Sequence, residues 1–248
     1  MDLQIRGKRA AVAAGSAGLG LSAARALVEA GVEVVICGRD RDRLETAVER
    51  LGPGVRGVVA DVGDAEGATS FVEMAAERLG GVDILVTNAG GPPPGNFAAT
   101  PVEAYPAALD LNLMSTVAMC KAAVPDMQTR GWGRVVAITS ITVRQPIEYL
   151  MLSNTARAGA TGFLKTLALE VAGDGITVNS VQPGFHATDR LAGLPEEDSA
   201  AIIADIPVGR MGDADDLGRV VAFLCSQTAG FITGSAIPVD GGSYRGLL

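Results

Sequence analysis

The chain has 248 residues, a length that suits one α/β domain with a full-sized core. Its 28 acidic and 20 basic residues give a net charge of −8, which disfavours nucleic acid and anionic membrane surfaces as partners and favours a small molecule. The three cysteines, Cys37, Cys120 and Cys225, are too widely spaced for a disulfide framework or a metal-ligand cluster, so we expect a cytoplasmic protein without a metal.

The N-terminal segment has the outline of a signal peptide, since the basic MDLQIRGKR is followed by the uncharged AAVAAGSAGLGLSAA. Gly15, Gly18 and Gly20 interrupt that apolar run. No uncharged apolar stretch reaches the ~18 residues of a membrane span. We therefore expect a soluble protein with no membrane partner.

Short apolar runs rich in β-branched residues alternate with longer amphipathic stretches along the chain. The predicted strands cover residues 9–14, 33–37, 56–60, 83–87, 134–139, 177–182 and 235–240. The predicted helices cover residues 21–30, 41–51, 65–79, 102–128, 153–172 and 213–225. The alternation is typical of βαβ units, and near-continuous apolar strands suit a sheet covered on both faces. We predict a single α/β domain over 1–248, a Rossmann-type doubly wound parallel sheet of about seven strands.

The first strand leads into a glycine-rich turn, AAGSAGLG, at residues 13–20. Such a turn lets a pyrophosphate approach backbone N–H groups at the positive end of a helix dipole. A turn that serves packing alone is the alternative. The residues predicted to bind a dinucleotide here are Ala14, Gly15, Ser16, Gly18, Leu19 and Gly20.

This turn resembles the Thr-Gly-x-x-x-Gly-x-Gly turn of the short-chain dehydrogenase/reductase family, and the resemblance covers nearly the whole chain. Aligned on Gly18 and Gly20, the sequence has Ala13 and Ala14 where the family has threonine and its first glycine. A Cβ at position 14 narrows the space for the cofactor. The resemblance, which includes the 3-oxoacyl-acyl-carrier-protein reductase branch, implies a nicotinamide cofactor.

Further segments resemble the family's cofactor scaffold in the same order. The resemblance implies an adenine contact at Asp61 and Val62 and a cofactor-binding turn after the fourth predicted strand. The members of that turn and of the expected nicotinamide segment are Asn88, Ala89, Gly90, Pro183, Gly184, His186 and Thr188. Each segment alone reads equally well as a helix cap, a turn or a strand end, but their order and spacing together favour cofactor binding.

The end of the second predicted strand, VVICGRD, determines the choice of cofactor. An acidic side chain there would accept hydrogen bonds from a ribose 2′-hydroxyl, whereas an arginine suits a 2′-phosphate. Gly38 leaves room and Arg39 supplies positive charge, so we expect NADP(H), with NAD(H) as the alternative cofactor. The alternative for Arg39 is a solvated residue at a helix start.

The catalytic helix departs from the family pattern. The family's active site combines four residues: an Asn on the long helix, a Ser after the fifth strand, a Tyr that transfers a proton and a Lys that holds the ribose. Asn112 and Ser140 match the first two, but the expected Tyr and Lys positions hold Ser153 and Arg157. Because Ser153 and Arg157 are four residues apart, their side chains are expected on the same face of the helix. An aliphatic hydroxyl is a far weaker acid than a phenol of pKa about 10, and Arg157 can donate to ribose hydroxyls without shuttling protons.

Three sources could supply the missing proton. Tyr149 precedes Ser153 by four residues and would share its helix face if the helix began early, although Pro146 favours a loop there. His186, the only histidine, has an ordinary pKa of about 6.5 and lies beside the expected nicotinamide site. Ordered water, positioned by Asn112 and Ser140, is the third source.

Two loops belong to the predicted substrate region. The sequence GGPPPG at 90–95 predicts either a rigid apolar wall or an inert turn, and residues 191–207 correspond to the family's substrate lid. The resemblance also implies a homodimer or homotetramer formed through the helices near 102–128 and 153–172, whose alanine-rich faces permit close approach.

We therefore expect an NADP(H)-dependent oxidoreductase that acts on a carbonyl or alcohol substrate, such as a ketone or a 3-oxoacyl thioester, with a non-standard proton donor. Two alternatives stay open. One is a non-redox enzyme on the same scaffold, a lyase or isomerase. The other is a nucleotide-binding protein with little catalysis, for which the loss of both Tyr and Lys is the main argument.

Overall fold

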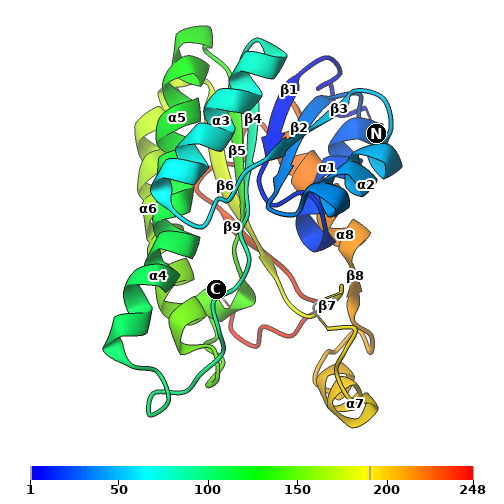
Figure 1. Ribbon diagram of the computed structural model, residues 1–248, viewed down its shortest axis with the longest axis vertical. Coiled ribbons are helices and arrows are strands. Elements are labelled where there is room, and N and C mark those ends of the chain that lie inside the picture. The colour runs from blue at the N-terminus through cyan, green and yellow to red at the C-terminus, as the bar shows by residue number, and fades with distance from the viewer. Residues whose placement is uncertain (1, 190, 248) are drawn as a thin grey trace.

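The computed structural model describes residues 2–189 and 191–247. Its seven parallel strands form one sheet in the order β3-β2-β1-β4-β5-β6-β9, with helices on both faces (Figure 1). These strands are β1 (Arg9–Val12), β2 (Glu33–Gly38), β3 (Val55–Val59), β4 (Ile84–Thr87), β5 (Gly133–Ile138), β6 (Ile176–Pro183) and β9 (Ala236–Val239). The predicted doubly wound parallel sheet is therefore confirmed.

The helices include several short pieces that the sequence pattern did not separate. The α-helices are α1 (Gly18–Glu29), α2 (Arg41–Leu51), α3 (Ala65–Leu79), α4 (Tyr105–Leu109), α5 (Ser115–Arg130), α6 (Met151–Val171), α7 (Glu196–Ala204) and α8 (Ala214–Cys225). The short turns are η1 (Val102–Ala104), η2 (Asp110–Met114), η3 (Ile141–Val143) and η4 (Ala172–Asp174), and a separate two-stranded ladder is formed by β7 (His186–Ala187) and β8 (Gly212–Asp213).

Each face of the sheet has its own apolar core. Helices α3, α5 and α6 cover one face, where Phe71 is completely buried, and helices α1, α2 and α8 cover the other, where Leu27 is completely buried (Figure 1). Neighbouring strand residues contribute to opposite cores, as Val35 and Val34 of β2 do, because alternate side chains of a strand point to opposite faces. This arrangement explains the continuous apolar character of the strands.

The long helix predicted over 102–128 is interrupted. It consists of η1, α4, the π turn η2 and α5 in succession, so the run carries one wide turn at Asp110–Met114. A π turn inserts an extra residue into helical backbone and often marks a functional site. Asn112 lies within this turn.

The helical run Val102–Arg130 is, within the described residues, the one helix whose length and apolar character would suffice to cross a membrane. Half of its most apolar window is buried inside the fold, and core helices of folded domains share this composition. Helix α5 supplies completely buried residues such as Met119 and Met127 to the core that it shares with α3 and α6.

Three helices begin at the edge of the sheet where the ligand is expected. Helices α2 and α3 begin at Asp40 and Asp64, whose carboxylates accept hydrogen bonds from the backbone N–H groups of Arg43 and Gly67. Helix α1 begins without any such side-chain cap. It follows β1, and β1 lies between β2 and β4, where the strand order reverses. Ligands of open α/β sheets bind at such a switch point.

Candidate functional site

The glycine turn holds an alanine in a conformation that favours glycine. Ala14 has a φ of 46°, in the left-handed region. Its backbone N–H donates to the Cys37 Sγ at 3.3 Å, and the Gly15 N–H donates to the Cys37 carbonyl at 2.9 Å. Burial raises the pKa of the Cys37 thiol to about 12, so Cys37 stays protonated and serves the turn as a hydrogen-bond acceptor. The end of β2 thus fixes the turn that follows β1.

Two glycines of this turn differ in the space around them. A Cβ on Gly20 would lie 2.3 Å from the Ala14 carbonyl oxygen. A Cβ on Gly18, which has a φ of 54°, would have the Thr188 Cγ2 at 3.8 Å as its nearest neighbour among the described residues. Helix α1 lacks a side-chain cap, so no capping side chain accepts from its first backbone N–H groups. The donors present fit a pyrophosphate, because backbone N–H groups at a helix start bind anions.

The predicted adenine contacts lie next to this turn. The Asn88 side chain donates to the Ala14 carbonyl oxygen at 3.4 Å and joins the loop after β4 to the turn. Asp61 accepts a hydrogen bond from the Gly63 N–H and lies 3.7 Å from the guanidinium of Arg39. Both charged side chains of this pair are largely exposed. Arg39 therefore has a carboxylate neighbour as well as room for a ligand.

Asn112 connects the π turn to the loop after β4. Its amide nitrogen donates to the Gly90 carbonyl oxygen at 2.9 Å, and the residue is buried. Within residues 2–189 and 191–247, the Asn112 Oδ1 has no hydrogen-bond partner although it is buried. A buried acceptor of this kind costs free energy unless a donor reaches it.

Arg157 is held by backbone carbonyls. Its Nη1 donates to the carbonyl oxygens of Ile138 and Thr139 at 3.1 Å and 3.2 Å. Its Nη2 lies 3.4 Å from the carbonyl oxygens of Ala89 and Gly90. The guanidinium therefore bridges the ends of β4 and β5 and is buried there. A direct contact with a ribose, which the sequence comparison anticipated, would have to compete with these bonds.

Ser140 and Ser153 each lie near a member of this bridge along the chain. Ser140 directly follows Thr139, and its Oγ accepts a hydrogen bond from the Thr142 N–H at 3.1 Å, so its own proton stays available for donation. Ser153 lies one helical turn before Arg157 on α6 and is buried at 9% exposure. The structure thus brings Asn112, Ser140, Ser153 and Arg157 together at the carboxyl ends of β4 and β5.

Tyr149 lies outside this group. Helix α6 begins at Met151, so Tyr149 precedes the helix and does not share a helical face with Ser153. Its side chain is 64% exposed. Its backbone carbonyl accepts a hydrogen bond from the Gly95 N–H at 2.8 Å, so the proline-rich loop and the entry to α6 form a bridge between Gly95 and Leu150. The early helix start needed for a Tyr149–Ser153–Arg157 row is absent.

His186 is buried in the short ladder beside β6. Its ring packs on Gly212, where a Cβ would come within 2.7 Å of the imidazole, and its Nδ1 lies 3.2 Å from the Gly184 carbonyl oxygen. Burial lowers the pKa of His186 below its usual value, although this hydrogen bond and the carboxylates of Asp216 and Asp213 act in the opposite direction. His186 is therefore neutral near pH 7 and is a poor proton donor.

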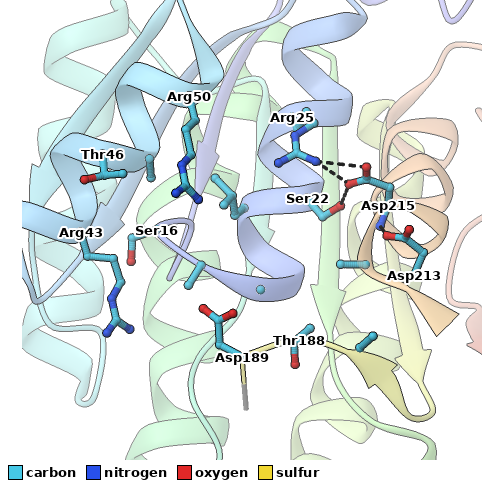
Figure 2. A pocket seen from close by; sticks show the side chains of 16 residues that line it. Ser16, Ser22, Arg25, Arg43, Thr46, Arg50, Thr188, Asp189, Asp213 and Asp215 are labelled. Atoms are coloured by element: carbon cyan, nitrogen blue, oxygen red, sulfur yellow. Dashed lines mark hydrogen bonds and ion pairs between the residues drawn. The ribbon is translucent and has the colours of Figure 1, made fainter. Parts of the chain in front are cut away.

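A cavity of about 410 Å³ opens beside the glycine turn, between α1, α2 and the start of α8 (Figure 2). Ser16, Gly18 and Thr188 of the predicted cofactor site line it. Sequence reasoning made no prediction for two further lining residues, Arg43 and Arg50 of α2. Their seven-residue spacing was a usable pattern, because it places them on one helix face, but only the packed structure shows that this face looks onto α1.

Comparisons with known proteins agree with this arrangement. Residues 13–244 match a family described as Enoyl-(Acyl carrier protein) reductase. The human protein Dehydrogenase/reductase SDR family member 4 is 35% identical over 242 residues, covering 95% of this chain and 87% of the relative. The 3-oxoacyl-[acyl-carrier-protein] reductase FabG of Haemophilus influenzae is 35% identical over 240 residues, covering 97% of this chain and 99% of the relative.

Solved structures extend the likeness to three dimensions. The L-sorbose reductase of Gluconobacter frateurii, complexed with NADPH and L-sorbose, is 32% identical and covers all of both chains with a TM-score of 0.93. YwfH, an NADPH-dependent reductase involved in bacilysin biosynthesis, is 26% identical with a TM-score of 0.92 and covers 97% of this chain and all of that one.

Proposed function

The chain belongs to the short-chain dehydrogenase/reductase family and is an oxidoreductase of that type, and on this premise we propose that it uses NADP(H) to interconvert a carbonyl compound and an alcohol. The observation that carries the proposal is the open, uncapped turn at Gly18, together with the positive charge of Arg39 directly after β2. The NADPH complex of the similar L-sorbose reductase and the NADPH dependence of YwfH support the choice of cofactor. When bound, the nicotinamide supplies or accepts a hydride.

The proposed roles of the chain's own residues follow from their hydrogen bonds. Ser140 donates a hydrogen bond to the reacting oxygen of the substrate without transferring its proton, because its Oγ already accepts from Thr142. Arg157 acts as a positioning residue that fixes the ends of β4 and β5. Ser153 is buried one helical turn before Arg157 and offers a hydroxyl without the acidity of a phenol.

For the proton, the proposal selects ordered water positioned by Asn112 and Ser140. The unpartnered Oδ1 of Asn112 offers such a water an acceptor. The exposure of Tyr149 and the buried, neutral state of His186 argue against both side chains. Because water is as weak an acid as an aliphatic hydroxyl, its proposed role is to relay a proton from bulk solvent to the reduced oxygen, so that no hydroxide is left in the site.

The test begins with fluorescence titration of the protein with NADPH and NADH. We expect NADPH to bind more tightly, and undetectable binding of both would refute the proposal. Turnover is then measured with a panel of ketones and 3-oxoacyl thioesters, for the wild type and for Tyr149→Phe and His186→Gln. Both variants are expected to keep turnover within about threefold, since general acid catalysis contributes about 100-fold or more. A 100-fold loss in either would identify that side chain as the proton donor.

A second candidate is a nucleotide-binding protein with little catalysis. The observation that favours it is the pairing of Ser153, which is no tunable acid, with an Arg157 that donates to backbone carbonyls. NADPH binding without turnover of any carbonyl substrate would support this second function. Turnover above that of a Ser140→Ala variant would support the first.

We also propose an oligomeric state, a substrate lid and a cellular location for the protein. The exposed apolar residues Leu169 on α6 and Met114 at the end of η2, directly before α5, support a homodimer or homotetramer formed through α5 and α6. Helix α7, which has no buried residue and projects from the body of the domain at its ligand edge, supports a substrate lid over 191–207 (Figure 1). A cytoplasmic location remains an inference from the cysteine content.

A further inference from the structure

A second cavity, of about 240 Å³, lies where β6 pairs with β9, the last strand of the sheet (Figure 1). Its walls come from η3 and the residue after it, from α6, from β6 and from the segment that leads into β9. All the residues predicted for the cofactor and for catalysis are among the described residues, and none of them lines this cavity. The cavity is therefore separate from the candidate functional site.

Gln182 brings an unpaired amide to this cavity. It lies on β6, is completely buried and lines the cavity wall. Within residues 2–189 and 191–247, neither its side-chain nitrogen nor its side-chain oxygen has a hydrogen-bond partner. A buried amide without partners costs free energy, because both groups lose their hydrogen bonds to water. A molecule bound in the cavity can supply the missing donor and acceptor.

Ser180 adds a hydroxyl on the same face of β6. Residues two apart in a strand project to the same side of the sheet, and Ser180, which is buried, also lines the cavity. Its hydroxyl takes part in no hydrogen bond with the described part of the chain. Ser180 and Gln182 can each donate and accept hydrogen bonds. A hydroxyl group of a bound molecule, which also donates and accepts, satisfies such a pair.

Two cations line the same cavity. The Lys165 ammonium donates to the Gly234 carbonyl oxygen at 3.0 Å, and the Arg144 guanidinium donates to the Ala236 carbonyl oxygen at 2.9 Å. In the described part of the chain, neither cation forms an ion pair, and no Asp or Glu lines the cavity. Positive charge without a carboxylate beside it favours an anion.

Gly234 makes room for the lysine. It has a φ of 67°, in the left-handed region, and a Cβ there would come within 2.9 Å of the Lys165 Nζ. A glycine therefore lets the ammonium lie against the backbone that leads into β9. The Gly234 carbonyl takes one of the three N–H donors of Lys165, so the other two can bind an anion.

We propose that this cavity binds a small hydroxycarboxylate, with its carboxylate on Lys165 and Arg144 and a hydroxyl on Gln182 and Ser180. The volume of about 240 Å³ is several times the ~30 Å³ that one water molecule occupies in the liquid, so the cavity admits a molecule of this class. The inference goes beyond the proposed function and does not depend on it, because the binding residues belong to neither the cofactor set nor the catalytic set.

The test is calorimetric titration of the protein, without dinucleotide, with L-malate, succinate and inorganic phosphate. L-Malate and succinate differ by one hydroxyl group. We expect the wild type to bind L-malate with a Kd below about 1 mM, a strength within reach of a ligand of this size. Succinate should bind about 10-fold more weakly, because it leaves the Gln182 amide unpaired.

Two variants separate the hydroxyl contact from the charge contact. Gln182→Met, which replaces the amide by an apolar side chain of similar length, should bind both acids equally and keep succinate binding within about threefold. Lys165→Met should weaken both acids about 10-fold. The matched control is Lys121→Met, which removes an exposed lysine of α5 outside the cavity and should change neither Kd by more than about twofold.

Thermal unfolding checks the same contacts without calorimetry. Gln182→Met is expected to unfold at a higher temperature than the wild type in the absence of acids, because it removes the unpaired buried amide. L-Malate should raise the unfolding temperature of the wild type by mass action and should raise that of Gln182→Met less. A variant that is folded but loses the preference for L-malate supports the proposal.

Three results would overturn the inference. The wild type could bind neither acid, which would mean that the cavity holds water only. It could bind phosphate more tightly than L-malate, which would make the site one for an inorganic anion. Gln182→Met could keep the full preference for L-malate, which would place the acid elsewhere. NADPH titration of the wild type tests the proposed function separately, so the failure of one leaves the other standing.

Discussion

Asn112 and Arg157 donate hydrogen bonds to the same acceptor, the carbonyl oxygen of Gly90, at 2.9 Å and 3.4 Å. Asn112 comes from the π turn of the interrupted helix, and Arg157 comes from the middle of α6. Their shared acceptor follows β4. Three segments far apart in sequence therefore meet at one oxygen, at the edge of the sheet where the ligand is expected.

The first prediction concerns Arg157→Lys. A lysine has a single ammonium group and cannot reach the carbonyls on both strand ends in the planar geometry of a guanidinium. Buried carbonyls would lose donors, and we expect the free energy of unfolding to fall by about 1–3 kcal/mol in urea denaturation. The exposed Arg39→Lys variant is the control, with an expected change below about 0.5 kcal/mol. Equal stability of both variants would contradict a positioning role.

The second prediction compares two glycines. In Gly20→Ala the new Cβ would lie 2.3 Å from the Ala14 carbonyl oxygen, so we expect a loss of about 1–3 kcal/mol of stability and weaker dinucleotide binding. In Gly162→Ala, on the exposed side of α6, the new Cβ would meet no heavy atom of the described residues within 4 Å outside its own stretch of helix. That variant should gain up to about 1 kcal/mol, since alanine is the better helix former. Thermal and urea unfolding measure both.

The third prediction uses the left-handed backbone of Ala14. An alanine there costs about 1–2 kcal/mol relative to glycine, whereas the added freedom of a glycine in the unfolded chain costs about 0.4–1 kcal/mol. We expect Ala14→Gly to be stabilising by up to about 1 kcal/mol. Ala13→Gly, one residue earlier and completely buried, should be destabilising by about that amount. Urea denaturation that ranks the two variants in the reverse order would show that the turn is not strained.

The fourth prediction is a pH dependence. Burial lowers the pKa of His186 in the folded protein, so the unfolded chain binds the proton more readily than the folded protein. The stability contributed by the neutral imidazole is present above the ordinary pKa of about 6.5 and is lost as the pH falls from there toward the folded pKa. Because His186 is the only histidine, His186→Gln should flatten the stability profile between about pH 7.5 and pH 5.5. The single imidazole NMR signal should titrate below pH 6.5, and a midpoint above it would contradict the prediction.

The fifth prediction restores a phenol. The double variant Ser153→Tyr with Arg157→Lys should raise ketone reduction at least about 10-fold, since a positioned general acid contributes about 100- to 10,000-fold. Arg157→Lys alone provides the control, because it changes the cation without adding an acid. Steady-state turnover with NADPH is the measurement. No gain in a folded double variant would show that the substrate pocket differs in more than these two residues.

The sequence predicted those features that local pattern determines. The apolar runs that alternate with amphipathic stretches predicted the seven strands. The glycine turn before α1 was predicted because its glycines lie close together in the sequence. The four carbonyls around Arg157 were beyond such reasoning, since they belong to segments that meet only in the folded sheet. The same holds for Arg43, whose helix pattern looks solvated until α1 is packed beside it. Helix α7 has a weakly amphipathic sequence and no buried residue, and therefore gave no apolar periodicity.

The bridge between Gly95 and Leu150 has a consequence for the exchange of segments between related proteins. The Gly95 N–H and carbonyl bond to Tyr149 and Met151, so the proline-rich loop and the approach to α6 are fastened by their backbones, whatever side chains they carry. A graft of either loop alone would leave one half of the bridge facing a segment of foreign length. We therefore expect substrate preference to transfer between homologues only when the proline-rich loop and the residues before α6 are exchanged together.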